Sequence, residues 1–232
     1  YGLPGRLTAR SATFRADSVF IVDLVGPDPG TGYDVLHCDQ GTATITGCAL
    51  EPHLLFPPLQ QSFTIVDAPT AVTPAFAGKP EGTSFSVSQI PFRINYNPTP
   101  GEVVLTVDGL PLQAAANAPE VLDGDADGGI EPGECTRLYL WLNNTDQELS
   151  GVTATLVSAT PGVVITHNTS TYAGGGAWPP GPPDNPKKND TAFQFYTVPS
   201  YPTWQPIEFL LVVTTPSSGQ FAVRYEIQTC QG

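Results

Sequence analysis

The stretch Asp123-Gly-Asp-Ala-Asp-Gly-Gly-Ile-Glu-Pro-Gly-Glu-Cys-Thr-Arg-Leu-Tyr-Leu-Trp-Leu142 joins an acidic loop to an apolar segment. Its last five residues alternate leucine with an aromatic residue, so the leucines share one face of an extended chain. Pro132 and Gly133 stand where a helix-loop-helix site would begin its second helix, and both disfavour a helix interior. We therefore expect the loop to lead into a β-strand.

The acidic loop has the ligand order of a twelve-residue calcium site. Counting from Asp123, carboxylates occupy positions 1, 3, 5, 9 and 12, and glycine occupies position 6, where the chain turns sharply around the ion. These carboxylates repel one another unless a cation lies among them. The sequence therefore predicts bound Ca²⁺, with an acidic solvated turn as the alternative. The expected ligands are Asp123, Asp125, Asp127, the carbonyl of Gly129, Glu131 and Glu134.

Composition favours an all-β chain. The 232 residues include 23 glycines and 25 prolines, and helical periodicity does not persist beyond about two turns. Short alternating segments separated by turn residues are typical of β-sandwiches. We expect two immunoglobulin-like sandwiches in tandem: an N-terminal arm over 1–10, a first sandwich over 11–111, a linker over 112–118 and a calcium-loop sandwich over 119–232. Ile130 is expected to anchor the loop to the core.

The net charge of −13, with nine Lys and Arg, argues against nucleic acid and anionic membrane surfaces as partners. No apolar run approaches the roughly 18 residues of a membrane span. The chain lacks an initiating Met and a secretory leader, so we interpret it as a mature or excised exported product, secreted or at a cell surface.

Four cysteines without metal-type spacing indicate disulfides and an oxidising compartment. Of the three pairings that four cysteines allow, proximity favours Cys38–Cys48 and Cys135–Cys230. Segments 33–38 and 42–48 are expected to form a hairpin whose far ends the first bridge would join, and 11–25 is expected to form one long strand. The N-x-[ST] sequons at Asn143, Asn168 and Asn189 are candidate glycosylation sites.

Two stretches resemble known families. The run from Asp123 to Val157, with its D-x-D-x-D-G-x-x-x-P-G-E pattern before a strand and an Asn-rich turn, resembles CARDB-like and related immunoglobulin-like modules of bacterial secreted and surface proteins. That resemblance implies a non-catalytic, calcium-steadied sandwich used in adhesion, carbohydrate association or spacing. The segment 92–107 resembles the closing hairpin of immunoglobulin-like domains of the ASPM/SPD-2/Hydin type.

Catalytic motifs are lacking in the sequence. His37, His53 and His167 are scattered without metal-ligand spacing, and no nucleophile elbow, zinc-protease motif, Walker loop or dinucleotide fingerprint occurs. A carboxylate pair in a cleft is the alternative that sequence leaves open. Exposed aromatics are the other candidate site, because they anchor interfaces and stack on sugars. The candidates are Tyr139, Trp141, Trp178 and Trp204, although Tyr139 and Trp141 would instead be covered if the 172–188 loop packs over them.

These observations favour a non-enzymatic extracellular structural or adhesion protein. Its expected partners are other copies of itself, joined into filaments by strand exchange of the N-terminal arm, or other cell-surface proteins. The alternative function is a carbohydrate-binding or spacer module excised from a larger secreted hydrolase.

Overall fold

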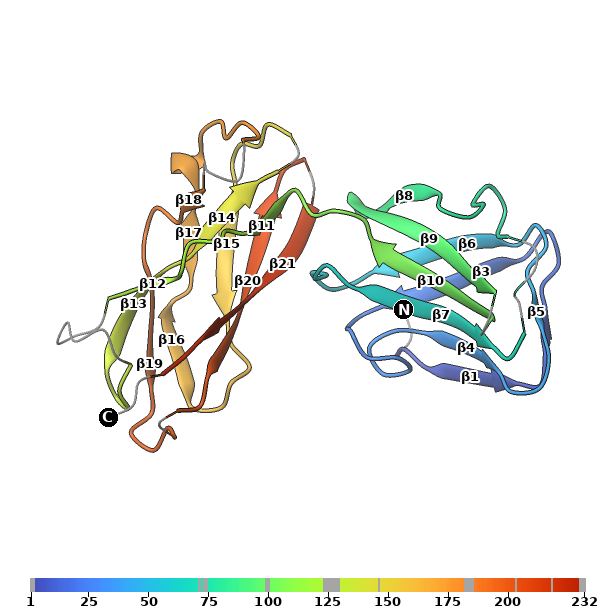
Figure 1. Cartoon of the computed structure of the whole chain (residues 1–232), viewed down its shortest axis with the longest axis horizontal. Coiled ribbons are helices and arrows are strands. Elements are labelled where there is room, and N and C mark those ends of the chain that lie inside the picture. Colours follow the sequence, from blue (N-terminus) through green and yellow to red (C-terminus); the bar gives the residue numbers. More distant parts are fainter. Residues whose placement is uncertain are drawn as a thin grey trace. The chain divides into compact units, whose positions relative to one another are not determined.

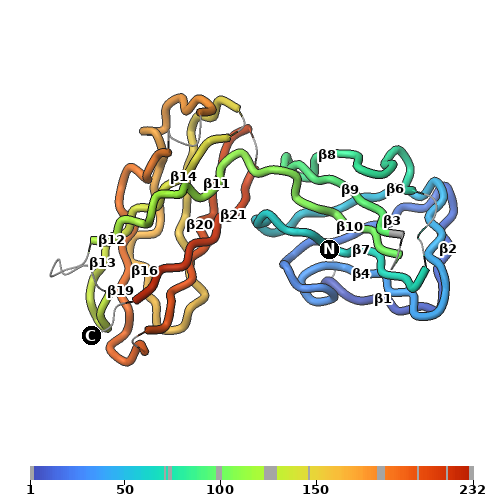
Figure 2. Tube along the Cα trace, viewed as in Figure 1, coloured from blue at the N-terminus to red at the C-terminus, as the bar shows by residue number. Residues whose placement is uncertain are grey.

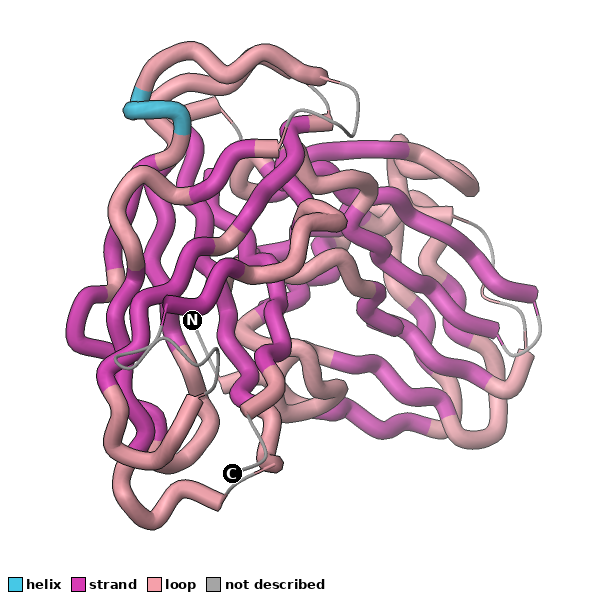
Figure 3. The backbone as a smooth tube through the Cα atoms, turned by 60° about the vertical axis from the view of Figure 1, so that its left-hand side comes forward, coloured by secondary structure: helices cyan, strands magenta, loops and turns pink. Residues whose placement is uncertain are grey.

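The computed structural model divides into two compact units, Tyr1–Leu110 and Pro111–Gly232. It describes all residues except 1–2, 71, 73–74, 99–100, 123–129, 146, 182–185, 203, 218 and 230–232. Within that part, regular structure is β-strand apart from the short 3₁₀ turn η1 (Ala173–Gly175), as Figure 3 shows. No helix among these residues has the length and apolarity needed to cross a membrane. The expected all-β class is confirmed.

The first unit contains a six-stranded sheet and two short two-stranded sheets (Figure 1). The six-stranded sheet has the order β1-β4-β7-β10-β9-β8, and the others pair β2 with β5 and β3 with β6. The strands are β1 (Arg6–Ala9), β2 (Ala12–Thr13), β3 (Val19–Leu24), β4 (Val35–Cys38), β5 (Ala43–Thr44), β6 (Ala49–Leu54), β7 (Ser62–Ala68), β8 (Ser84–Val87), β9 (Ile90–Pro98) and β10 (Gly101–Val107).

Residues 6–24 and 35–54 form two turns of a coil, which we call the first coil and the second coil. The three strands of the first coil pair in parallel with those of the second: Arg6 with Val35, Ala12 with Ala43, and Val19 with Ala49. β7 continues the stack beside β4, also in parallel. Figure 2 traces both coils in blue, side by side. Parallel ladders distinguish this unit from the antiparallel immunoglobulin sandwich.

Glycines let the second coil lie close to the first. A Cβ on Gly41 would stand 2.9 Å from the Cβ of Ser11 and 3.0 Å from the carbonyl oxygen of Arg10. Gly47 has φ +67°, and a Cβ there would lie 3.1 Å from the Cβ of Ala16. A larger side chain at either position would push the coils apart.

The coil corrects two expectations about the first unit. Segments 33–38 and 42–48 do not form a hairpin: β4 pairs with β1 and β7, whereas β5 pairs with β2. Gly41, which lies between the two segments, is a position of close coil packing. The long strand expected over 11–25 is broken between β2 and β3, where the Ser18 N–H donates to the Arg15 carbonyl.

Aromatic rings from several elements fill the core of the first unit. Phe63 on β7 meets Tyr33 and Phe92 at ring-centroid distances of 5.2 and 6.2 Å. Phe20 on β3 stacks on Phe76 at 5.7 Å. Burying such rings removes large apolar areas from water and so stabilises the core of this unit.

The second unit has sheets of order β11-β14-β18, β12-β13-β19-β16 and β17-β15-β20-β21. Phe195 and Phe209 meet edge-to-face at 5.0 Å between the second and third of these sheets. The strands are β11 (Leu112–Ala114), β12 (Glu120–Leu122), β13 (Cys135–Tyr139), β14 (Trp141–Asn144), β15 (Thr153–Val157), β16 (Val163–His167), β17 (Thr169–Thr171), β18 (Lys187–Lys188), β19 (Phe193–Thr197), β20 (Ile207–Thr215) and β21 (Gly219–Ile227).

The observed boundary between the units corrects the expected linker. Residues 112–114 form β11, which pairs with β14, and the Leu112 side chain is fully buried. The segment 112–118 therefore begins inside the second unit's sheet. A linker has few packed contacts, whereas Leu112 supplies core volume.

The expected N-terminal arm also begins a folded element. Arg6–Ala9 form β1, which is hydrogen-bonded to β4 of the same chain. These arm residues are thus part of their own sheet rather than extended away from it.

Candidate functional site

The acidic loop closes a β-hairpin of the second unit. β12 and β13 pair antiparallel, with Leu122 opposite Arg137, and the chain between them includes the loop. The predicted exit into a strand at Cys135 is confirmed. Ile130 is 4% exposed, which confirms that this side chain is anchored in the core. The expected ligands Asp123, Asp125, Asp127 and Gly129 lie outside the described residues.

The return limb of the loop is held against β19. The Thr197 hydroxyl donates to the Glu131 carbonyl at 3.1 Å, and the Gly133 N–H donates to the Thr197 carbonyl at 2.7 Å. Glu131 and Glu134 also bond to each other, since the Glu131 N–H donates to Glu134 Oε2 at 3.4 Å. Glu131 and Glu134, the two expected ligands that the structure describes, thus stand on a limb fixed by the sheet. Their oxygen donors are the type that Ca²⁺ prefers.

Among the described residues, which do not include 123–129, the side chains of His, Cys, Asp and Glu form no group of three or more able to hold a metal. A calcium site that includes Glu131 and Glu134 would therefore need further ligands from 123–129. Six to eight oxygens are usual for Ca²⁺, so two residues alone supply too few.

Lys188 covers the paired aromatics Tyr139 and Trp141. Its ammonium lies 4.4 Å from the Tyr139 ring centroid and 5.7 Å from that of Trp141, and 2.9 Å from a Glu120 carboxylate oxygen. Lys188 lies at the end of the 172–188 loop, on β18, which pairs with β14. The alternative in which that loop packs over the two rings therefore fits the structure better than an open binding face.

Trp178 is part of the core. It is 1% exposed and stacks on Tyr172 at 6.0 Å, and the Tyr172 hydroxyl donates to the Leu140 carbonyl at 3.0 Å. Burial raises the pKa of that hydroxyl well above its ordinary value. The Pro- and Gly-rich loop around Trp178 gave no sequence signal of this burial. The structure corrects the expectation of a ligand-binding Trp178, because a ring within the core cannot stack on a ligand.

Trp204 is the exposed aromatic of the predicted set. Its side chain is 57% exposed and its backbone adopts φ +79°, a conformation that bulky residues rarely adopt. The backbone N–H of Trp204 donates to the Thr229 hydroxyl at 3.1 Å. Strained backbone held in place by hydrogen bonds is a frequent mark of functional positions.

The cysteines Cys38 and Cys48 are buried free thiols in the structure, so the expected bridge between them is absent. Cys38 ends β4 of the six-stranded sheet, whereas Cys48 precedes β6 of a separate sheet, and its thiol donates to the Ala49 carbonyl at 3.4 Å. Burial raises the pKa of both thiols. The bridge was expected from a hairpin that does not form. Cys135 is exposed, and its expected partner Cys230 lies outside the described residues.

The sequons occupy different environments. Asn168 is exposed and Asn143 is half-buried. Asn189 is 1% exposed, and its side-chain amide nitrogen donates to the carbonyl of Thr191 at 2.7 Å. A glycan attached there would have to displace core hydrogen bonds, which corrects the expectation that Asn189 is a glycosylation site.

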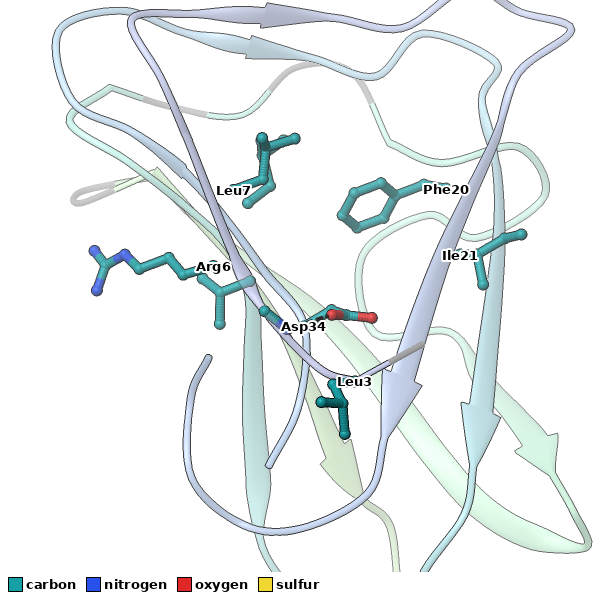
Figure 4. Close-up of a pocket in the computed structure, with 9 residues that line it drawn as sticks. Leu3, Arg6, Leu7, Phe20, Ile21 and Asp34 are labelled. Atoms are coloured by element: carbon teal, nitrogen blue, oxygen red, sulfur yellow. Dashed lines mark hydrogen bonds between the residues drawn. The ribbon is translucent and has the colours of Figure 1, made fainter. Parts of the chain in front are cut away.

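Beside β1 the structure has a groove that sequence analysis did not predict. Its volume is about 370 Å³, and we call it the first-coil groove. It lies between β1 and β3, with Leu7 and Phe20 directed into it from either side and Leu3 at one end (Figure 4). Leu36, which is buried, also lines it. Leu7 lies in the segment 1–10, which we expected to be an N-terminal arm, and nothing in the sequence of that segment indicates a groove.

Comparisons with known proteins add no family. No protein-family model matches the chain, and no curated protein matches it. The fold and the residues of these sites therefore carry the functional argument.

Proposed function

We propose that this is a non-catalytic extracellular structural or adhesion protein stabilised by Ca²⁺, in which the second unit is an immunoglobulin-like sandwich. The observation that carries the proposal is the β12–β13 hairpin. Its acidic connection returns through the buried Ile130 and is hydrogen-bonded to Thr197 of β19. An ion bound at such a connection would lock a hairpin of the sheet, which is a mechanical role rather than a chemical one.

The paired histidines of the first unit support a structural role. His37 Nδ1 lies 2.7 Å from Asp67, and His53 lies 3.0 Å from both Asp23 and Glu51. The contacts with Asp67 and Asp23 join neighbouring strands, as stabilising cross-strand pairs do, whereas Glu51 lies on the same strand as His53. The expected partners are other copies of this chain or other cell-surface proteins.

Calorimetry of the whole chain with added Ca²⁺ or chelator tests the proposal. At a free Ca²⁺ concentration of one hundred times Kd, binding should stabilise the fold by about 2.7 kcal/mol. Glu134→Gln should remove most of this gain, whereas Glu148→Gln, at an exposed site of the same unit, should retain it. A melting temperature that Ca²⁺ leaves unchanged in the unsubstituted protein would contradict the calcium assignment.

Trp204 supports the alternative of a carbohydrate-binding module. An exposed ring on a constrained backbone is suited to stack on a sugar face. Screening the chain against a glycan array should then give binding that Trp204→Ala removes and Trp178→Phe leaves intact. An array without binding would favour the structural function.

A further inference from the structure

The second unit carries a surface pocket of about 300 Å³, which we call the β20–β21 pocket. Residues 159–161, which follow β15, form its first wall, and residues 205–206, which precede β20, form its second wall. Glu208 of β20 and Glu226 of β21 complete the lining. Small-molecule sites range from about 300 to 1,000 Å³, so this pocket suits a ligand of one or two small rings.

Two carboxylates meet across the strand ladder in this pocket. Glu208 is directly opposite Glu226 in the antiparallel pair of β20 and β21, which run side by side (Figure 1). Both glutamates are exposed, whereas their neighbours Ile207 and Ile227 are buried, so the carboxylates lie on the outer face of the sheet. Like charges directly opposite one another destabilise a sheet. Such local conflicts are expected at functional sites.

Each carboxylate is held by a polar neighbour on β21 or just after it. Arg224 Nε lies 3.3 Å from Glu208 Oε1, and Gln228 Nε2 donates to Glu226 Oε1 at 2.7 Å. The guanidinium also reduces the repulsion between the two glutamates. A carboxylate has about four lone-pair sites, so both groups retain capacity to accept from a ligand. Two held acceptors at neighbouring positions suit two hydroxyl groups of one molecule.

The walls of the pocket are hydrogen-bonded in place. The Glu208 N–H donates to the Thr160 hydroxyl at 3.0 Å, which holds the first wall against β20. For the second wall, the Tyr201 hydroxyl donates to the carbonyls of Gln205 and Pro206 at 3.2 and 3.4 Å. A pocket that is formed in advance costs less ordering when a ligand binds.

Trp204 stands next to the second wall, because it directly precedes Gln205 in the chain. One hydroxyl holds both residues: that of Thr229 accepts from the Trp204 backbone N–H at 3.1 Å and donates to the Gln205 carbonyl at 3.2 Å. The exposed indole offers an apolar surface beside the polar pocket. A sugar presents the matching surfaces, with hydroxyl groups around its ring and C–H groups on its faces.

We propose that the β20–β21 pocket binds a neutral sugar, whose hydroxyl groups donate to Glu208 and Glu226 while its apolar face lies against Trp204. A uronic acid would bring a third carboxylate to the pair, so the pocket selects neutral sugars against acidic ones. An organic amine would also pair with carboxylates, but Arg224 already supplies a positive charge there, and uncharged hydroxyl groups are the better match. This rests on the carbohydrate-binding alternative of the proposed function and does not depend on Ca²⁺.

The test is NMR titration of the full chain with the methyl glycosides of glucose, galactose, mannose and N-acetylglucosamine, and with methyl glucuronide and spermine. At least one neutral glycoside should bind and shift the backbone amide signals of Gln205, Glu208 and Glu226. Methyl glucuronide should bind at least about tenfold more weakly. Glu208→Ala and Glu226→Ala should each weaken glycoside binding about tenfold. Glu148→Ala, at an exposed glutamate of the same unit, should change it less than about twofold.

The outcomes separate this proposal from the function on which it rests. Binding by none of the neutral glycosides would remove the carbohydrate-binding alternative, and this proposal with it. Glycoside binding that leaves the three amide signals unshifted would overturn this proposal alone, as would equal weakening by Glu148→Ala. Methyl glucuronide that binds as tightly as the neutral glycosides, or binding of spermine alone, would overturn it too. If an alanine variant does not fold, the shifts of the unsubstituted chain decide the question.

Discussion

Asp23 and His53 face one another across the parallel β3–β6 ladder, with Asp23 Oδ1 3.0 Å from His53 Nδ1. His37 and Asp67 do the same across β4 and β7 at 2.7 Å. Both pairs are separated by 30 residues. One turn of the coil has nearly this length, so each pair is a direct consequence of coil stacking.

The pair at His53 predicts a pH dependence of stability. The carboxylates of Glu51 and then Asp23 raise the pKa of His53 above its ordinary value. A raised folded-state pKa stabilises the fold below the unfolded value of about 6.5, and that stabilisation is lost as pH rises through the folded value. His53→Gln should therefore destabilise the protein at about pH 5.5, by less than about 1 kcal/mol, and have a smaller effect at about pH 8. Chemical denaturation at both pH values measures this; an effect that grows with pH would contradict it.

Asn189 should be among the costliest polar residues to remove. Its side-chain oxygen accepts from the Leu140 N–H at 2.7 Å, where the chain passes from β13 to β14. Asn189→Ala would leave that buried N–H unpaired, so we expect a loss of about 2–3 kcal/mol of unfolding free energy. Asn168→Ala, at the exposed sequon, should cost less than about 0.5 kcal/mol. Equal losses in urea denaturation would show that Asn189 is not a structural bridge.

Because the two coils are in close contact at Gly41, alanine substitutions at Gly41 and at Gly5 should change the stability of the first unit by different amounts. Gly41→Ala should destabilise the first unit by about 1–3 kcal/mol, because its Cβ would stand 2.9 Å from that of Ser11. Gly5→Ala is the control, since a Cβ there would meet nothing within 4 Å. Thermal unfolding of both variants compares them. A Gly41→Ala protein as stable as the control would argue against tight coil stacking.

The thiols should separate into two classes. Cys38 and Cys48 are fully buried, so they should react with a thiol reagent only after unfolding. Cys135 is exposed and should react in the native protein unless oxidation joins it to Cys230. Peptide mapping without reductant tests that bridge. Rapid native labelling of Cys38 or Cys48 would be inconsistent with the buried positions.

Local pattern alone was sufficient to predict the strand that follows the acidic loop. Leu138, Leu140 and Leu142 are all fully buried, and Ile130 packs beneath the loop as expected. Side-chain alternation is a property of each extended residue and its neighbours, so it is visible in sequence without knowledge of the partner strands. The all-β class follows from the same alternation combined with frequent turn residues.

The tertiary structure alone decided which strands meet. The coil pairs residues about thirty positions apart, which placed Cys38 on the six-stranded sheet and Cys48 just before a strand of another sheet, and built β1 into its own unit. It also buried Trp178 and Asn189. Which strands pair in a sheet depends on the long-range packing of whole strands. Parallel strands are not joined by a short turn, so the sequence between them carries no signal that they pair.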